Sequence, residues 1–98
     1  MDKEHVLTIL RNHASELQAG GLAHLRLFGS VARGQANAQS DIDLLADFDT
    51  SKRITLVTLG SLENHLSTLL GAKVELTSEN WLREAVRQRV LQEAVLAF

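Results

Sequence analysis

The residues best suited to do chemistry are two aspartates, Asp41 and Asp43, separated by a single residue. They lie in the segment Ser40–Phe48, where polar and apolar residues alternate almost strictly, a pattern typical of a half-buried strand. Residues two apart on a strand project from the same face, with Cα atoms about 6.6 Å apart. Two carboxylates placed in this way can bind a pair of hard divalent cations.

A third carboxylate, Glu75, is expected on the same open face. The segment Lys73–Thr77 predicts a short strand with Val74 and Leu76 facing inward and Glu75 facing outward. If this strand lies beside the aspartate strand, three carboxylates converge, and a bound divalent cation relieves their repulsion. The simpler alternative is that Glu75 forms an ion pair with Lys73.

Ten residues separate the dipeptide Gly29-Ser30 from Asp41. Because glycine has no side chain, a phosphate can approach the backbone there, and the helical turn expected at Ser30–Arg33 directs free N–H groups outward. The Ser30 hydroxyl adds a donor, and Arg33 can reach the same anion. Alone, such a pair is an ordinary turn and helix cap. Together with the aspartates, it supplies the working parts of nucleotide chemistry.

Other elements must hold these residues in position. The periodicity predicts a helix through Val6–Leu17, a strand at Leu22–Phe28, a leucine-rich helix over residues 56–70 that Gly71 ends, and a last helix from a cap at Ser78 toward Phe98. Two of the three strands have one apolar side, so we expect helices on one face of a small mixed three-stranded sheet. The short first connection favours antiparallel neighbours. The predicted class is therefore α/β, of the α+β type.

Length and composition narrow the function classes. Ninety-eight residues, 45% of them apolar, are expected to form a single domain over residues 1–98. The absence of cysteine excludes disulfides, a thiolate nucleophile and Cys-ligated zinc. A net charge of −2 argues against binding to a nucleic-acid backbone. The sequence contains no apolar run long enough to span a membrane, and charges in Met1–Arg11 argue against a signal peptide, so the expected location is cytoplasmic.

The combined pattern resembles the minimal nucleotidyltransferases of the DNA polymerase β superfamily. Their motif is Gly-Ser, ten residues and Asp-x-Asp, and the match extends through Phe28–Gly34 and Ser40–Leu45. The resemblance covers the chain from about Leu22 to the last helix. It implies the nucleotidyltransferase fold and transfer of a nucleoside monophosphate to a hydroxyl, with release of pyrophosphate. One departure is Glu75, since the third acidic residue in such families is often aspartate.

The resemblance also implies roles for the candidate residues. Asp41 and Asp43 would hold two Mg²⁺ ions, and Glu75 would complete the metal site and help to deprotonate the nucleophile. Gly29 and Ser30 would bind the β- and γ-phosphates of ATP, the expected co-substrate.

The same resemblance points to a partner. Stand-alone members often occur beside a HEPN-domain toxin, which is a ribonuclease, and some adenylylate a toxin tyrosine. The implied function is therefore Mg²⁺-dependent transfer of AMP to a partner toxin, which would present the acceptor hydroxyl. One alternative is a binding module that neutralises its partner by occlusion. Another is a small-molecule nucleotidyltransferase, similar to those that modify aminoglycosides, with a partner subunit completing the pocket.

The chain ends in an apolar stretch, Val90–Phe98, in which only Gln92 and Glu93 are polar. One helix face cannot bury so many apolar side chains against a small sheet. We therefore expect this helix to contact a second chain, in a homodimer or a hetero-oligomer. The alternative is a helix end folded over its own core.

Overall fold

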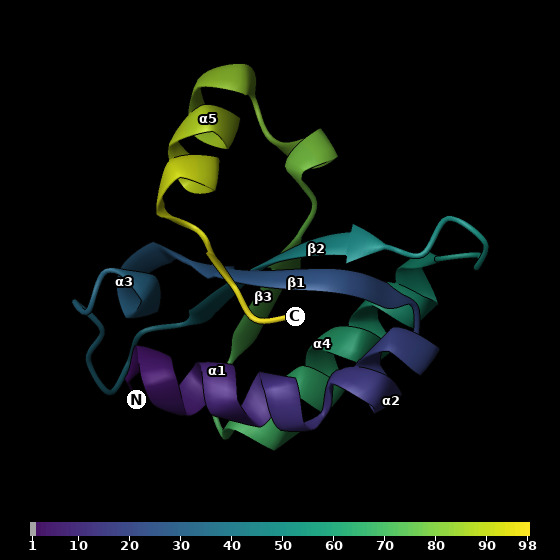
Figure 1. Ribbon diagram of the computed structural model, residues 1–98, viewed down its shortest axis with the longest axis horizontal. Coiled ribbons are helices and arrows are strands. Elements are labelled where there is room, and N and C mark those ends of the chain that lie inside the picture. Colours follow the sequence, from purple (N-terminus) through teal and green to yellow (C-terminus); the bar gives the residue numbers. More distant parts are fainter. Residues whose placement is uncertain (1) are drawn as a thin grey trace.

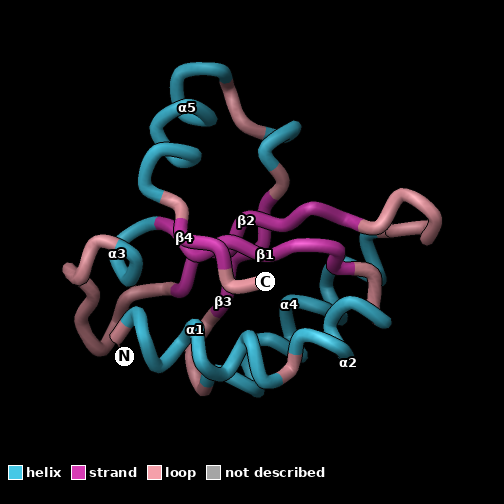
Figure 2. The backbone as a smooth tube through the Cα atoms, viewed as in Figure 1, coloured by secondary structure: helices cyan, strands magenta, loops and turns pink. Residues whose placement is uncertain are grey.

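The computed structural model describes residues 2–98. Its centre is a mixed sheet made of β1 (Leu22–Phe28), β2 (Ile42–Phe48), β3 (Val74–Thr77) and β4 (Val95–Leu96). The strand order is β3-β2-β1-β4 (Figure 2). As predicted from the short connection, β1 is antiparallel to β2. β1 is also antiparallel to β4, whereas β2 and β3 are parallel.

Helices lie on both sides of this sheet, rather than on one face only as predicted, because the segment after β3 crosses to the other side and is helical there (Figure 1). They are α1 (Lys3–Asn12), α2 (Ala14–Ala19), α3 (Gly29–Ala32), α4 (Leu56–Leu70), the 3₁₀ turn η1 (Glu79–Trp81) and α5 (Glu84–Glu93). In Figure 1, α1, α2 and α4 run beneath the sheet, while α5 stands on the opposite side, above α3. The α4 helix provides the crossover that a parallel β2–β3 pair requires. None of the helices in residues 2–98 is both long enough and apolar enough to cross a bilayer.

Local sequence signals account for the start of α1 and for both ends of α4. The Asp2 carboxylate accepts a hydrogen bond of 2.8 Å from the His5 N–H at the start of α1. Thr55 caps α4 in the same way, through a 3.2 Å bond from the Thr58 N–H. The predicted end of α4 at Gly71 is confirmed, since Gly71 adopts φ 68°.

The core lies between the sheet and the helices α1, α2 and α4. Side chains that are at most 1% exposed come from all these elements: Leu10, Leu17, Leu25, Leu27, Ile42, Leu44 and Leu66. The inward faces predicted for the second and third strands are confirmed, because Ile42, Leu44, Val74 and Leu76 are buried. Leu45 corrects the prediction. The alternation along Ser40–Phe48 predicts Leu45 on the same open, polar face as Asp43, yet Leu45 is fully buried, and η1 lies next to β2.

The predicted first helix divides into two. α1 ends at Asn12, and His13 has φ −107° and ψ 13°, which lies outside regular helix geometry. The chain continues as α2 from Ala14, with Leu17 buried against the sheet. The apolar spacing is the same in both segments, so periodicity alone could not reveal the break.

The predicted last helix is wrong at both ends. Ser78 caps only the 3₁₀ turn η1, accepting a hydrogen bond from the Asn80 N–H, and α5 begins six residues after Ser78, at Glu84. At the other end the helix stops at Glu93, and the following residues form β4. The sheet therefore has four strands rather than three, while the predicted fold class is confirmed.

Long-range hydrogen bonds explain why the end of the chain is extended rather than helical. The Arg11 guanidinium donates to the carbonyl oxygens of Leu96 at 3.0 Å and Ala97 at 2.9 Å. The Ala97 N–H donates to the Leu25 carbonyl at 2.8 Å. Ala97 is buried, so part of the apolar C-terminal stretch covers the protein's own core.

Replacing Arg11 tests this account of the chain end. Arg11→Ala removes two charge-assisted hydrogen bonds to backbone carbonyls, so we expect the free energy of unfolding to fall by about 1–2 kcal/mol. Urea denaturation measures the change, and faster amide exchange at Ala97 locates it. Arg53→Ala, in an exposed loop, is the control. Equal free energies of unfolding for the two variants would show that the Arg11 hydrogen bonds do not stabilise the chain end.

Candidate active site

Strand pairing brings the three predicted carboxylates to one end of the sheet. Asp43 of β2 is paired in register with Phe28 of β1 on one side and with Glu75 of β3 on the other. Neighbouring residues on paired strands project from the same face, so Asp43 and Glu75 share the open face. Asp41 lies one residue before β2 begins. The Lys73 ammonium lies 3.9 Å from the Asp41 carboxylate, and we find no Lys73–Glu75 pair among residues 2–98.

The electrostatics of this cluster favour a bound cation. Burial raises the pKa of Asp43, and the negative charges of Glu75 and Asp41 raise it further, while Arg33 acts in the opposite direction. Grouped carboxylates offer the hard oxygen ligands that Mg²⁺ prefers, so the chemistry of the donor set fits this ion. Within residues 2–98, however, no three acidic or histidine side chains already stand as ligands around one point. The carboxylates are gathered but do not form a closed coordination sphere.

Gly29 follows β1 directly, and its backbone is left-handed, with φ 79°. A Cβ atom built at this position would collide with Oδ2 of Asp43. Both the conformation and the lack of space therefore require glycine. From the sequence, Gly29 is predicted to let a phosphate approach the backbone. The structure adds a second reason for the glycine, which is the close approach of the Asp43 side chain.

The groups predicted to bind phosphate already hold an anion. The Gly29 N–H donates a 3.0 Å hydrogen bond to Oε1 of Glu93. Nη1 of Arg33 lies 3.2 Å from Oε1 and 3.1 Å from Oε2 of the same carboxylate. Ser30 is half-buried beside them. Gly29 and Arg33 therefore converge on one carboxylate, although Glu93 is 64 residues beyond Gly29 in the chain.

A cavity of about 510 Å³ opens at these groups. β1, α3 and β2 contribute Phe28, Gly29, Ser30, Arg33 and Asp43, and α5 contributes Val86, Arg89, Val90 and Glu93. Its volume is in the range of small-molecule sites. Asp41 and Glu75 do not line it, so the cavity reaches the carboxylate cluster through Asp43 alone.

The contribution of α5 to this cavity was missed from the sequence. Nothing in the helical periodicity indicates which part of the sheet α5 will cover. The one available signal was the position of Glu93, one of two polar residues in an otherwise apolar C-terminal stretch. In Figure 1, α5 stands above the sheet next to the end that carries α3, and the two helices are in contact.

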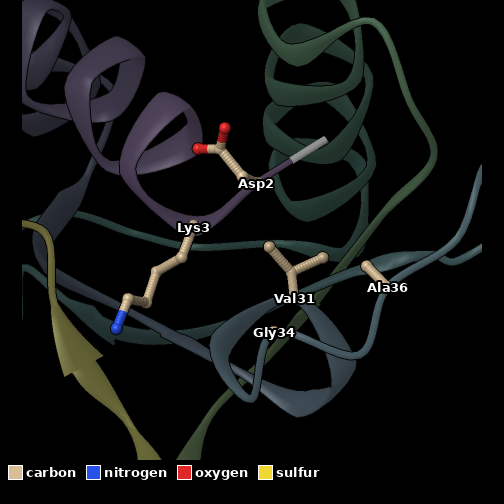
Figure 3. Close-up of a pocket in the computed structure, with 5 residues that line it drawn as sticks. All are labelled: Asp2, Lys3, Val31, Gly34 and Ala36. Carbon is tan, nitrogen blue, oxygen red and sulfur yellow. The ribbon is translucent and has the colours of Figure 1, made fainter.

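A second cavity, of about 410 Å³, lies on the other side of α3, between α3 and the start of α1. It is lined by Asp2, Lys3, Val31, Gly34 and Ala36. Figure 3 shows Val31 projecting from α3 toward α1, with the Lys3 side chain extending away from Asp2. The Asp2 carboxylate already caps α1, and none of the predicted site residues lies here. The first cavity is therefore the candidate active site.

Comparison with known proteins agrees with this geometry. Residues 7–97 match the family model described as nucleotidyltransferase domain. The protein adenylyltransferase MntA of Thermococcus cleftensis is 36% identical over 93 residues, which cover 94% of this chain and 92% of that protein. A solved structure assigned as a minimal nucleotidyltransferase superposes with a TM-score of 0.80 at 38% identity, covering 97% of this chain and 95% of the other.

More distant structures share the fold. A chain in a complex of a tri-AMPylated Shewanella oneidensis HEPN toxin with its MNT antitoxin matches with a TM-score of 0.65 at 18% identity, covering 94% of this chain and 71% of the other. The pattern of Gly29-Ser30 followed by Asp41 and Asp43 lies within the matched residues, and Gly29, Ser30 and Asp43 line the candidate site. This chain therefore belongs to the nucleotidyltransferase domain family, and within it to the minimal nucleotidyltransferases.

Proposed function

We propose that this nucleotidyltransferase transfers AMP from ATP to a hydroxyl group on a partner protein. One observation carries the proposal: the anion-binding Gly29 N–H and the Asp43 carboxylate meet at the same end of the sheet, in one cavity. A triphosphate and its metal ions need such an arrangement of donors beside acceptors. The name of the Thermococcus relative, protein adenylyltransferase, supports the choice of a protein substrate.

Each candidate residue has a distinct task in this proposal. The Gly29 N–H, the Ser30 hydroxyl and the Arg33 guanidinium bind phosphate oxygens of ATP. Asp41, Asp43 and Glu75 would hold a pair of Mg²⁺ ions. When bound, Mg²⁺ neutralises the phosphate charge and stabilises the charge that develops during transfer.

The transfer needs only ATP and the acceptor hydroxyl as reactants. The acceptor hydroxyl oxygen forms a bond to the α-phosphorus of ATP, the bond from that phosphorus to the bridging oxygen breaks, and pyrophosphate leaves. Glu75 is exposed on β3 beside Asp43, and in this proposal its carboxylate accepts the hydroxyl proton.

The proposed partner is a HEPN-type ribonuclease toxin, which modification would silence. Solved structures with this fold include toxin–antitoxin complexes, one of which contains AMP-PNP. The C-terminal residues Leu91 and Leu96 are 36% and 49% exposed and offer apolar contacts to a partner chain. They lie at the end of α5 and in β4, rather than on one continuous helix as predicted.

Loss of the aspartates should abolish modification. With a HEPN partner, ATP and Mg²⁺, intact mass spectrometry should detect AMP on the partner. Asp41→Asn with Asp43→Asn should slow its formation by at least about 100-fold, because the phosphates lose their metal ions. Asp47→Asn is the matched control. Asp47 lies on the same strand but pairs with Arg26 at 3.1 Å, so this variant should retain activity.

Two other results would point elsewhere. Unchanged AMP transfer by the double variant would remove Asp41 and Asp43 from the mechanism. If the wild-type protein forms no adduct but still inhibits the ribonuclease on binding, the occlusion module is the correct alternative.

The third carboxylate can be tested separately. Glu75→Gln removes the proposed base and one metal ligand, so we expect the rate of AMP transfer to fall by about 100-fold. Glu75→Asp keeps the carboxylate that relatives often use and should recover part of that rate. Lys73→Gln, which alters the neighbouring pair with Asp41, is the control for a general change of charge. Equal rates for the wild-type and Glu75→Gln enzymes would exclude Glu75 from catalysis.

Metal binding has a readout independent of activity. Because its folded-state pKa is raised, ionised Asp43 destabilises the metal-free fold above that pKa, and the penalty disappears as the pH falls through it. At neutral pH, Asp43→Asn should therefore raise the Tm of the metal-free protein. Mg²⁺ should raise the Tm of the wild-type protein but not of this variant. Calorimetry tests both effects, and equal stabilisation by Mg²⁺ would contradict the assignment of Asp43.

A further inference from the structure

The Glu93 carboxylate lies where the proposed function places a phosphate. It accepts the Gly29 N–H hydrogen bond of 3.0 Å and contacts the Arg33 guanidinium through both oxygens. Carboxylates and phosphates present similar anionic oxygens, and arginine binds both through the same donors. Glu93 therefore accepts the hydrogen bonds that Gly29 and Arg33 would otherwise donate to a phosphate.

Glu93 and a phosphate cannot both use these donors. The backbone N–H of Gly29 carries one hydrogen, and Glu93 accepts it. A phosphate at this position would also bring negative charge against the Glu93 carboxylate, which is only 24% exposed and therefore poorly screened. Binding of a triphosphate to Gly29 and Arg33 must displace the Glu93 side chain.

The backbone around Glu93 allows this displacement without unfolding. Val90, one turn earlier in α5, is buried, and Val95, two residues later, pairs with Leu27 of β1. The main chain is thus fixed on both sides of Glu93. Its side chain lines the cavity and is partly exposed, so a change of side-chain rotamer is sufficient to free Gly29 and Arg33.

We propose that Glu93 is an internal competitor that sets the affinity of the site for ATP. This inference rests on the proposed function, in which Gly29 and Arg33 bind the triphosphate. Nucleotide binds only the fraction of molecules in which Glu93 has left the site, and its apparent affinity is reduced by that fraction. Because Glu93 belongs to α5, nucleotide binding also breaks the side-chain hydrogen bonds that join α5 to Gly29 and Arg33.

Titration with AMP-PNP and Mg²⁺ tests the proposal by isothermal calorimetry. Glu93→Gln keeps the size of the side chain but removes the charge that holds Arg33, so its Kd for AMP-PNP should be about three- to tenfold lower than that of the wild-type protein. Glu84→Gln removes a carboxylate from the same helix, where Glu84 is 70% exposed and 3.9 Å from Arg87. This control should leave the Kd unchanged.

The other outcomes overturn the proposal in distinguishable ways. An unchanged or higher Kd for Glu93→Gln, with the wild-type protein binding AMP-PNP normally, would refute competition and leave the proposed function intact. Absence of AMP-PNP binding by both proteins would refute both. NMR of the wild-type protein tests the same point without a substitution that could misfold. AMP-PNP should shift the resonances of the Gly29 amide and of the Glu93 carboxyl carbon together. A shift of Gly29 alone would contradict displacement.

Discussion

The contact between the Asp43 carboxylate and the backbone of Gly29 is the constraint on which the site depends. A side chain at Gly29 would occupy the space of the carboxylate, and the left-handed backbone there turns the chain from β1 into α3. The two halves of the sequence motif are therefore one physical unit. The glycine makes room for the aspartate, and the same absence of a side chain exposes the N–H that binds an anion.

Charge is the second organising feature. Carboxylates gather at one end of β2 and β3, where their repulsion and burial raise the pKa of Asp43. A few ångströms away, Arg33 and the Gly29 N–H bind Glu93. The Glu93 carboxylate thus pairs with the anion-binding groups of Gly29 and Arg33, whereas Lys73 and Arg33 relieve only part of the repulsion among the clustered carboxylates. In the proposed function, the triphosphate and its metal ions would bind these two adjoining sets of groups together.

Much of the site, but less of the fold, could be predicted from the sequence. Alternation along β2 and β3 correctly placed Asp43 and Glu75 on one face, because strand parity is a local property. The fourth strand was missed because its extended form depends on Arg11, 86 residues before Ala97, and such contacts leave no periodic signal. The contact of Glu93 with Gly29 and Arg33 was missed for the same reason, since the path of α5 is set by tertiary packing.

A crystal structure of the protein with Mg²⁺ and AMP-PNP would show directly whether the triphosphate binds at Gly29 and Arg33. We expect phosphate oxygens on the Gly29 N–H and Arg33, metal ions on Asp41 and Asp43, and the Glu93 side chain turned out of the cavity. A triphosphate bound elsewhere, with the contact between Glu93 and Gly29 intact, would contradict this expectation.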